Sequence, residues 1–124
     1  MTDNAAQARE VTRRLLAACA PGGDLDQAPV SARFRCWTPY RDTELGAAGT
    51  TVLRQVLAGF CGHGGRDVPF RPHALISDGE AVVVEAVRED AAPILSVTLV
   101  LTLAGGLVDE AKVYVDPRAL GALR

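Results

Sequence analysis

Cysteine is scarce in this sequence of 124 residues, and its three copies cannot form a disulfide framework. Cys19, Cys36 and Cys61 are odd in number and far apart, and their spacing matches no zinc-binding pattern. Free cysteine is among the residue types most often buried, so packing is favoured over reactivity for all three. We therefore expect reduced thiols in a cytoplasmic protein and no metal site.

Long apolar runs and runs of basic charge are also missing. The longest apolar stretch, residues 94–103, has about half of the ~20 residues that a membrane-spanning helix needs, and the first residues lack the apolar segment of a secretory signal. The net charge is −2 and the basic residues are scattered, whereas nucleic-acid binding requires a basic surface. The glycines at 62–65 follow no strand in a GxGxxG pattern. We expect no membrane, nucleic acid or organic cofactor as a partner.

Strand patterns dominate the second half of the chain. Three long strands are predicted at 81–89, 94–103 and 108–116, and their connections are short enough to require antiparallel neighbours. Odd positions of the middle strand are all aliphatic, while its even positions mix hydroxyl side chains (Ser96, Thr98 and Thr102) with Ile94 and Val100. One face of the sheet is therefore expected to be buried. The apolar set of the middle strand comprises Leu95, Val97, Leu99, Leu101 and Leu103.

Helical patterns occur in the first half of the chain. The elements expected there are, in order, a helix at 5–19, a short helical turn within 24–31, a strand at 34–38, a loop at 40–48, a helix at about 50–60 and a strand at 70–76. Thr2, Asp3 or Asn4 is expected to cap the first helix, and Thr50 or Thr51 the second. Early helices followed by a run of strands indicate an α+β fold in a single domain spanning residues 1–124. Helices packed on one face of a curved antiparallel sheet would form a cone with an apolar interior and an open mouth.

Four segments resemble the nuclear transport factor 2-like superfamily, and its SnoaL-like branch in particular. They are Phe-Arg-Cys-Trp-Thr-Pro at 34–39, Gly-Thr-Thr-Val-Leu-Arg-Gln-Val-Leu-Ala-Gly-Phe at 49–60, Ile-Ser-Asp-Gly-Glu-Ala-Val-Val-Val at 76–84, and the Tyr-x-Asp-Pro at 114–117. The resemblance covers nearly the whole chain and implies a cystatin-like α+β barrel, a cone-shaped curved sheet wrapped around the N-terminal helices. Members of the superfamily include polyketide cyclases, ketosteroid isomerases, limonene epoxide hydrolases, dehydratases and non-catalytic binding or dimerisation modules, so the fold alone does not choose a function.

The catalytic residues of these families are absent at the positions that the resemblance identifies. The general base of the isomerase-like members falls at Thr38, which cannot abstract a proton at neutral pH, and their acidic donor falls among aliphatic residues of the long central strand. Arg88-Glu-Asp90 resembles the Arg-x-Asp pair that the epoxide hydrolases carry on one strand. The position of their second aspartate, however, is occupied here by Val113. A solvated hairpin end is the favoured interpretation of Arg88 and Asp90.

Four side chains remain as weak candidates for acid–base chemistry: Glu85, Arg88, Asp116 and His63. Glu85 would have a raised pKa only if it pointed inward, and the flanking valines make the better inward face, so we expect it to point outward. Asp116 ends the last strand, where a cap or an ion pair with Arg118 competes with a catalytic role. His63 lies in a glycine loop, where a solvated side chain is usual.

The expected pocket has eight lining residues: Phe34, Cys36, Trp37, Thr38, Tyr40, Phe60, Leu99 and Val113. Trp37 and Tyr40 are expected to flank its mouth, where they would stack on a ligand or fill the cone. The sequence predicts a small-molecule-binding SnoaL-like protein for an apolar polyketide- or terpenoid-like metabolite. It would be a cofactor-free cyclase, isomerase or dehydratase, or else a non-catalytic ligand carrier or dimeric accessory module. Convergent titratable groups in the pocket would favour the enzyme, and a purely aliphatic cavity would favour the carrier.

The even positions of the 94–103 strand suggest an interface. That face carries small hydroxyl and aliphatic side chains beside Tyr114. It is too apolar to be exposed to solvent over a large area and too polar to be part of the hydrophobic core. We expect a homodimer through this convex face, with Thr98, Val100 and Tyr114 near its centre. Dimers on this face are also common in the superfamily that the chain resembles.

Overall fold

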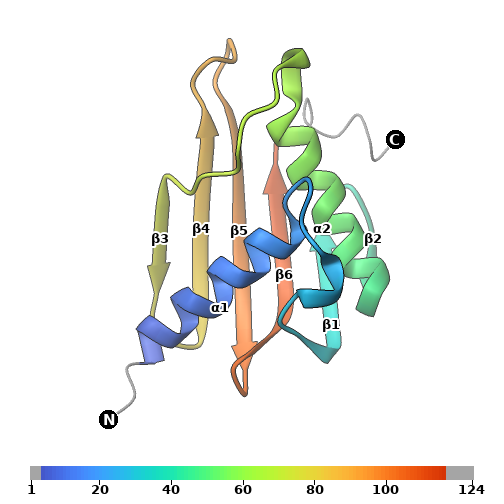
Figure 1. The fold of residues 1–124 in the computed structure, drawn as a ribbon, viewed down its shortest axis with the longest axis vertical. Helices are drawn as coiled ribbons and strands as arrows, with labels where there is room; N and C mark the ends of the chain where they lie inside the picture. The colour runs from blue at the N-terminus through green and yellow to red at the C-terminus, as the bar shows by residue number, and fades with distance from the viewer. Residues whose placement is uncertain (1–3, 117–124) are drawn as a thin grey trace.

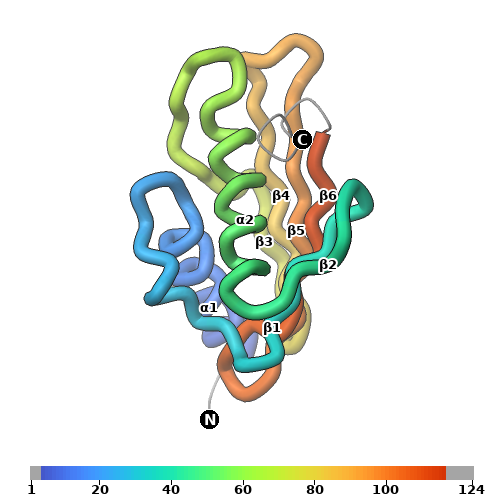
Figure 2. The backbone as a smooth tube through the Cα atoms, turned by 90° about the vertical axis from the view of Figure 1, so that its right-hand side faces the viewer, coloured from blue at the N-terminus to red at the C-terminus, as the bar shows by residue number. Residues whose placement is uncertain are grey.

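The computed structural model describes residues 4–116. One sheet with the strand order β2-β1-β6-β5-β4-β3 carries two α-helices on one of its faces (Figure 1). The elements are α1 (Asn4–Cys19), η1 (Leu25–Gln27), β1 (Val30–Thr38), β2 (Arg41–Leu45), α2 (Gly46–Cys61), η2 (His63–Gly65), β3 (Ala74–Ser77), β4 (Ala81–Arg88), β5 (Leu95–Ala104) and β6 (Leu107–Val115). Figure 2, turned by 90°, shows both helices on the same side of the sheet. Thr2, Asp3 and Arg118, named above as possible caps or ion-pair partners, lie outside the described residues.

The sheet is mixed, because one of its strand pairs is parallel. β1 pairs with β6 in parallel, whereas the pairs β1–β2, β3–β4, β4–β5 and β5–β6 are antiparallel. The expectation of a wholly antiparallel sheet is therefore wrong at this pair. Parallel neighbours need a long crossover connection, and here α2 and four further strands lie between β1 and β6 in the chain. Nothing in the local pattern of β1 specifies that distant neighbour.

The alternation of β5 sets the buried face of the sheet, as predicted. The inward residues of β5 are Leu95, Val97, Leu99 and Leu101, each at most 1% exposed. Leu103 is only partly buried, because the pairing with β6 shifts register after Thr102. Gly105 and Gly106 both have positive φ (60° and 77°), which suits the two-residue turn that joins β5 to β6.

Residues 40–48 are not the loop that the sequence suggested. They contain β2, which pairs with β1, and the beginning of α2 at Gly46, which has no side-chain cap. Thr50 and Thr51 do not cap the helix either. Their hydroxyl groups donate back to the carbonyl oxygen of Ala47, at 2.9 and 3.0 Å. The charged, short β2 is an edge strand with no alternating apolar signal, which is why it was missed.

Close packing explains the glycine-rich first turn of α2. A Cβ at Gly49 would lie 2.8 Å from the carbonyl oxygen of Glu44 and 3.1 Å from the ring of Phe34. Glycine therefore lets α2 approach β1 and β2 more closely than any other residue would allow.

The strand expected at 70–76 is shortened to β3 at the edge of the sheet. Pro69 and Pro72 lack the backbone N–H that a ladder requires, so residues 66–73 cross from α2 to β3 without regular structure. The ring of Phe70 anchors this crossing in a T-shaped contact with Phe60, with ring centroids 5.8 Å apart. We call residues 66–73 the crossing segment.

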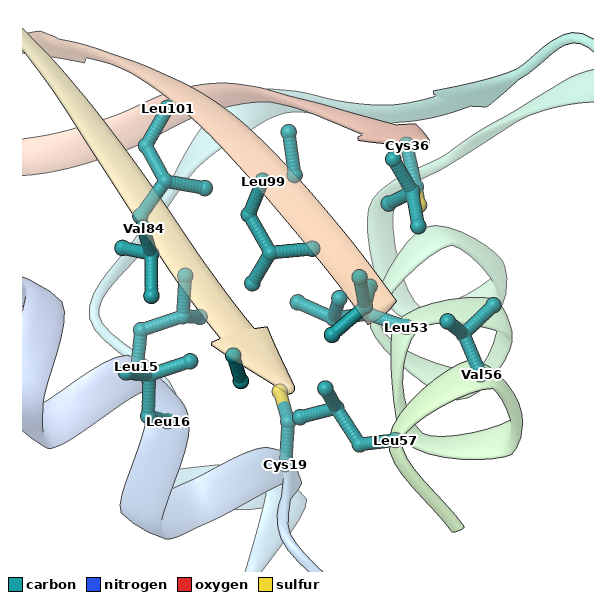
Figure 3. Close-up of a cluster of buried hydrophobic side chains, with 14 of the residues drawn as sticks. Leu15, Leu16, Cys19, Cys36, Leu53, Val56, Leu57, Val84, Leu99 and Leu101 are labelled. Carbon is teal, nitrogen blue, oxygen red and sulfur yellow. The ribbon is translucent and has the colours of Figure 1, made fainter. Parts of the chain in front are cut away.

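The core lies between the two helices and the inner face of the sheet (Figure 3). Labelled there are Leu15, Leu16 and Cys19 of α1, Leu53, Val56 and Leu57 of α2, and Cys36, Val84, Leu99 and Leu101 of the sheet. Each is at most 7% exposed. Within residues 4–116, neither helix has the length and apolar character needed to cross a membrane.

Candidate functional site

The inner face of the sheet is packed against the helices. Phe34, Cys36, Leu99 and Val113, four of the residues predicted to line a pocket, are each 0% exposed. Figure 3 shows side chains of both helices and of the strands pointing into the same space. The structure thus brings these four residues together as parts of one core, and a ligand would meet them only if that core opened.

The three cysteines belong to this core as protonated thiols. Burial raises the pKa of Cys19 to about 11 and that of Cys36 to about 12, and it also raises the pKa of Cys61. The thiolate is the form that attacks substrates and binds metals, so these side chains are inert at neutral pH. Within residues 4–116, no three His, Cys, Asp or Glu side chains gather as a metal site would require.

The other four residues predicted to line or flank the pocket do not gather at one place. Thr38 is 2% exposed, and its Oγ1 accepts a hydrogen bond from the backbone N–H of Tyr40 at 3.3 Å. Phe60, at the end of α2, is also 2% exposed, whereas Tyr40 is 48% exposed. Trp37 lies on the outer face, where its ring meets Tyr114 in a T-shaped contact with a centroid distance of 5.6 Å. Its expected place at the mouth of the cone is wrong, because successive side chains of a strand alternate between faces.

Arg88 is the buried cation of the inner face, and the expectation of a solvated side chain is wrong for it. It is 4% exposed and continues the inward alternation of β4. Its guanidinium group donates to the backbone carbonyl oxygens of Phe60, Cys61, His63 and Arg66, at 2.8 to 3.2 Å. It also donates to both carboxylate oxygens of Asp90, at 3.0 and 2.5 Å. The last carbonyl groups of a helix lack partners within the helix, so Arg88 ties the end of α2 to the end of β4.

Asp90 shares a hollow of about 490 Å³ with Arg88, beside Phe60 and Val68. The hydrogen bonds from Arg88 hold the pKa of Asp90 below its ordinary value, against a smaller opposing effect of desolvation. A carboxylate with a lowered pKa is a weak general base. The Arg-x-Asp pair therefore has a clear structural role and little capacity for proton transfer.

Glu85, Asp116 and His63 lie at three separate places and form no common site. Glu85 is exposed on the outer face, opposite Thr98, as predicted. Asp116 follows β6, where its backbone N–H donates to the carbonyl oxygen of Ser96 at 3.2 Å. His63 begins η2, and its carbonyl group is one of the acceptors of Arg88.

A groove of about 520 Å³ lies between α1 and the crossing segment, and we call it the α1 groove. Its apolar lining consists of Ala6, Leu16, Ala17, Ala20, Phe70, Pro72 and Leu75. Arg9, Glu10 and Arg13 of α1 add charged groups to the same groove. Arg13 lies four residues after Arg9 and three after Glu10, so its side chain neighbours both of them along one side of the helix.

Sequence reasoning missed the α1 groove for two reasons. The helical pattern at 5–19 places Arg9 and Arg13 on the side opposite the apolar stripe, where a binding site is not expected, and the strand predicted at 70–76 ran across Phe70 and Pro72. One signal was present: Ala17 lies four residues after Arg13 on the same side of α1, so that side is less polar than a solvated face usually is.

The sequence matches no protein-family model and no curated protein. Solved structures do match it over nearly the full length. A candidate SnoaL-like polyketide cyclase from Jannaschia sp. CCS1 shares 20% identity at a TM-score of 0.70, covering 97% of this chain and 92% of that chain. An LEH-like epoxide hydrolase of M. tuberculosis shares 20% identity at a TM-score of 0.66, covering 98% and 97%. TerC, co-crystallised with polyporic acid, shares 15% identity at a TM-score of 0.67, covering 94% and 97%.

The similar structures also include proteins described as nuclear transport factor 2-like and a candidate ketosteroid isomerase. At these identities the similarity concerns the arrangement of helices and strands and does not extend to a reaction. The similarity extends along nearly the whole chain. This chain has the nuclear transport factor 2-like α+β fold.

Proposed function

We propose that this protein binds a small apolar molecule without transforming it. The observation that carries the proposal is the lack of a usable acid or base inside the fold. Within residues 4–116, the buried polar side chains are Thr12, Thr38, Thr50 and Arg88. Three of them are hydroxyls, and the guanidinium group of Arg88 is held by Asp90 and backbone carbonyls. A general acid or base needs a pKa near the working pH, which neither group offers.

The enzymatic alternatives find less support in the same geometry. A cofactor-free cyclase, isomerase or dehydratase needs at least one group that exchanges a proton with its substrate. Asp90 is held ionised by its ion pair, Glu85 lies on the outer face, and Cys36 is protonated and buried. Glu10, which lines the α1 groove, is paired with Arg13. Both enzymes and binding proteins have this fold, so the fold by itself is no evidence that this protein is an enzyme.

The α1 groove is the ligand site that we propose. Its volume of about 520 Å³ falls within the ~300–1,000 Å³ of sites for small molecules, and its lining is mostly apolar, as in such sites. TerC, a structure of this fold, was co-crystallised with polyporic acid, which supports small-molecule binding as a use of the fold. We place the protein in the cytoplasm, because unpaired thiols suit a reducing compartment.

Native mass spectrometry of protein purified from its own host tests this proposal. We expect one bound molecule of fixed mass, and we expect the Ala17→Phe variant to lose it because the ring occupies the groove. Ala48→Phe, at an exposed position of α2 outside the groove, is the matched control and keeps the ligand. The extracted molecule should be recovered unchanged after incubation with fresh protein. Its steady conversion to a product, or protein that retains no ligand at all, would overturn the proposal.

We also propose that a second copy of this chain covers the outer face of the sheet. Strand register aligns one row across that face: Ile76, Val83, Val100, Lys112 and Trp37. We call this row the outer band. Ile76 is 68% exposed and Val83 38%, and Tyr114, 44% exposed, packs beside the row on Trp37. A two-fold contact would cover this surface with its own counterpart, while Glu85 and Lys112 provide opposite charges on the same face.

A further inference from the structure

The α1 groove combines an apolar floor with a cationic rim. Leu16, at 7% exposed, and the half-buried Phe70 and Leu75 form the floor. Arg9 and Arg13 lie one helical turn apart on the exposed side of α1 and line the same groove. A molecule bound against these apolar side chains would therefore have one of its ends close to the guanidinium groups of Arg9 and Arg13.

The rim has a surplus of positive charge. Glu10 forms an ion pair with Arg13, which neutralises one of the two cations. Among residues 4–116, no acidic side chain pairs with Arg9. A guanidinium group presents a planar fork of donors that matches a carboxylate or sulfonate, and Arg9 keeps this fork available beside the apolar floor.

We infer that the α1 groove binds a small amphiphilic anion. The apolar body of this acid lies on Leu16, Phe70 and Leu75, and its anionic group meets Arg9. The inference rests on the proposed function and narrows its ligand from an apolar molecule in general to an apolar acid.

Charge and size both favour this occupant over others. A neutral apolar ligand would take water from Arg9 without offering an acceptor, which is unfavourable for a charged group. The groove volume of about 520 Å³ matches the size of a small-molecule site. A stable contact with another protein needs a larger surface, because it buries roughly 800 Å² on each partner. The groove is lined by α1, and Figure 2 shows α1 on one side of the sheet. The outer band lies on the opposite face, so dimerisation leaves the groove open.

Two fluorescent probes with the same aromatic skeleton test the inference directly. Anilinonaphthalene sulfonate carries an anionic group that N-phenylnaphthylamine lacks. In fluorescence titrations of the whole protein, we expect the sulfonate to bind about tenfold more tightly, as a charge-assisted contact would produce. Arg9→Gln should remove about fivefold or more of the sulfonate affinity and should not weaken binding of the neutral probe, while Arg9→Lys keeps most of the sulfonate affinity.

Two further variants locate the effect. Arg14→Gln makes the same charge change on the same helix, at an exposed residue that does not line the α1 groove, and should alter neither titration. Ala17→Phe should weaken both probes, because it fills the shared apolar site. All four substitutions are at exposed positions of α1, and circular dichroism melts verify that each variant is folded.

Each contrary result has a defined meaning. Equal affinities for the two probes, or equal losses in Arg9→Gln and Arg14→Gln, would overturn the acid inference while leaving the proposed function standing. Binding that Ala17→Phe does not weaken would place the probes elsewhere and overturn the inference as well. If neither probe binds, the inference and the proposed function fail together.

Discussion

Truncation of Leu99 to alanine distinguishes a packed interior from the lining of a ligand chamber. Leu99 is 0% exposed, and the strand register places Val84 and Val113, also 0% exposed, directly beside it. A side chain enclosed in this way loses contacts on every side when it is cut back. A side chain that merely lined an open chamber would lose few contacts, because part of its surface would already face empty or wet space.

The expected loss of unfolding free energy follows from the atoms removed. Three carbons at about 0.8 kcal/mol each account for about 2.4 kcal/mol of lost transfer energy. The two central strands beside Leu99 cannot collapse into the gap, so a cavity cost of about 1–2 kcal/mol adds to it. We therefore expect a loss of about 4 kcal/mol for Leu99→Ala. Thr102→Ala, at an exposed position of the same strand, should cost less than about 0.5 kcal/mol.

Urea unfolding followed by far-UV circular dichroism measures both variants. The protein concentration must be the same throughout, because the unfolding free energy of a dimer depends on it, and an unchanged m value verifies that the comparison is valid. A loss below about 0.5 kcal/mol for Leu99→Ala would refute the packed interior. It would also remove support for the α1 groove as the ligand site, because an open chamber around Leu99 would then be the better site for a ligand.

Three other predictions concern assembly, acid stability and thiol reactivity. Val100→Arg should convert a dimer into monomers in light scattering, because it buries unpaired charge in the outer band; Thr51→Arg, on the exposed side of α2, is the control, and a monomeric wild type would contradict the proposal. Arg88 lowers the pKa of Asp90 from its ordinary value of 3.8. The stability that this ion pair gives to the folded protein is therefore fully present above pH 3.8 and is lost as the pH falls through the lowered pKa of Asp90. Relative to wild type, Asp90→Asn should be destabilised by a constant amount between about pH 5 and 7, and the difference should vanish toward about pH 2; a difference that grows on acidification would be the contrary result. Cys19 and Cys36, with pKa values of about 11 and about 12, should react with dithionitrobenzoate at about pH 8 only after denaturation, and rapid labelling of the native protein would show that they are accessible.

Local patterns predicted much of the fold. The alternation in 94–103 identified which side chains of β5 are buried, and the spacing in 5–19 identified α1 to within one residue. Both signals work because side-chain direction repeats with the backbone period of a strand or a helix. The outward direction of Glu85 followed from the same alternation and is confirmed.

Features that depend on distant parts of the chain were not predictable in this way. β2 carries almost no apolar alternation and exists because β1 offers it an edge. The parallel pairing of β1 with β6 joins strands that lie far apart in the chain. Trp37 was expected at the mouth because only its sequence neighbourhood was known, and its face became clear from the register with β6.

By itself, then, the sequence determined the apolar face of each regular element and the α+β arrangement that buries those faces, because burial follows from periodicity within one segment. Only the tertiary structure decided the fate of Arg88, whose acceptors at Phe60 and His63 lie more than twenty residues away in the chain. The same is true of the α1 groove, which exists because Phe70 in the crossing segment packs opposite Leu16 of α1. A charged or apolar side chain acquires its role from the partners that surround it, and those partners are assembled only when distant segments fold together.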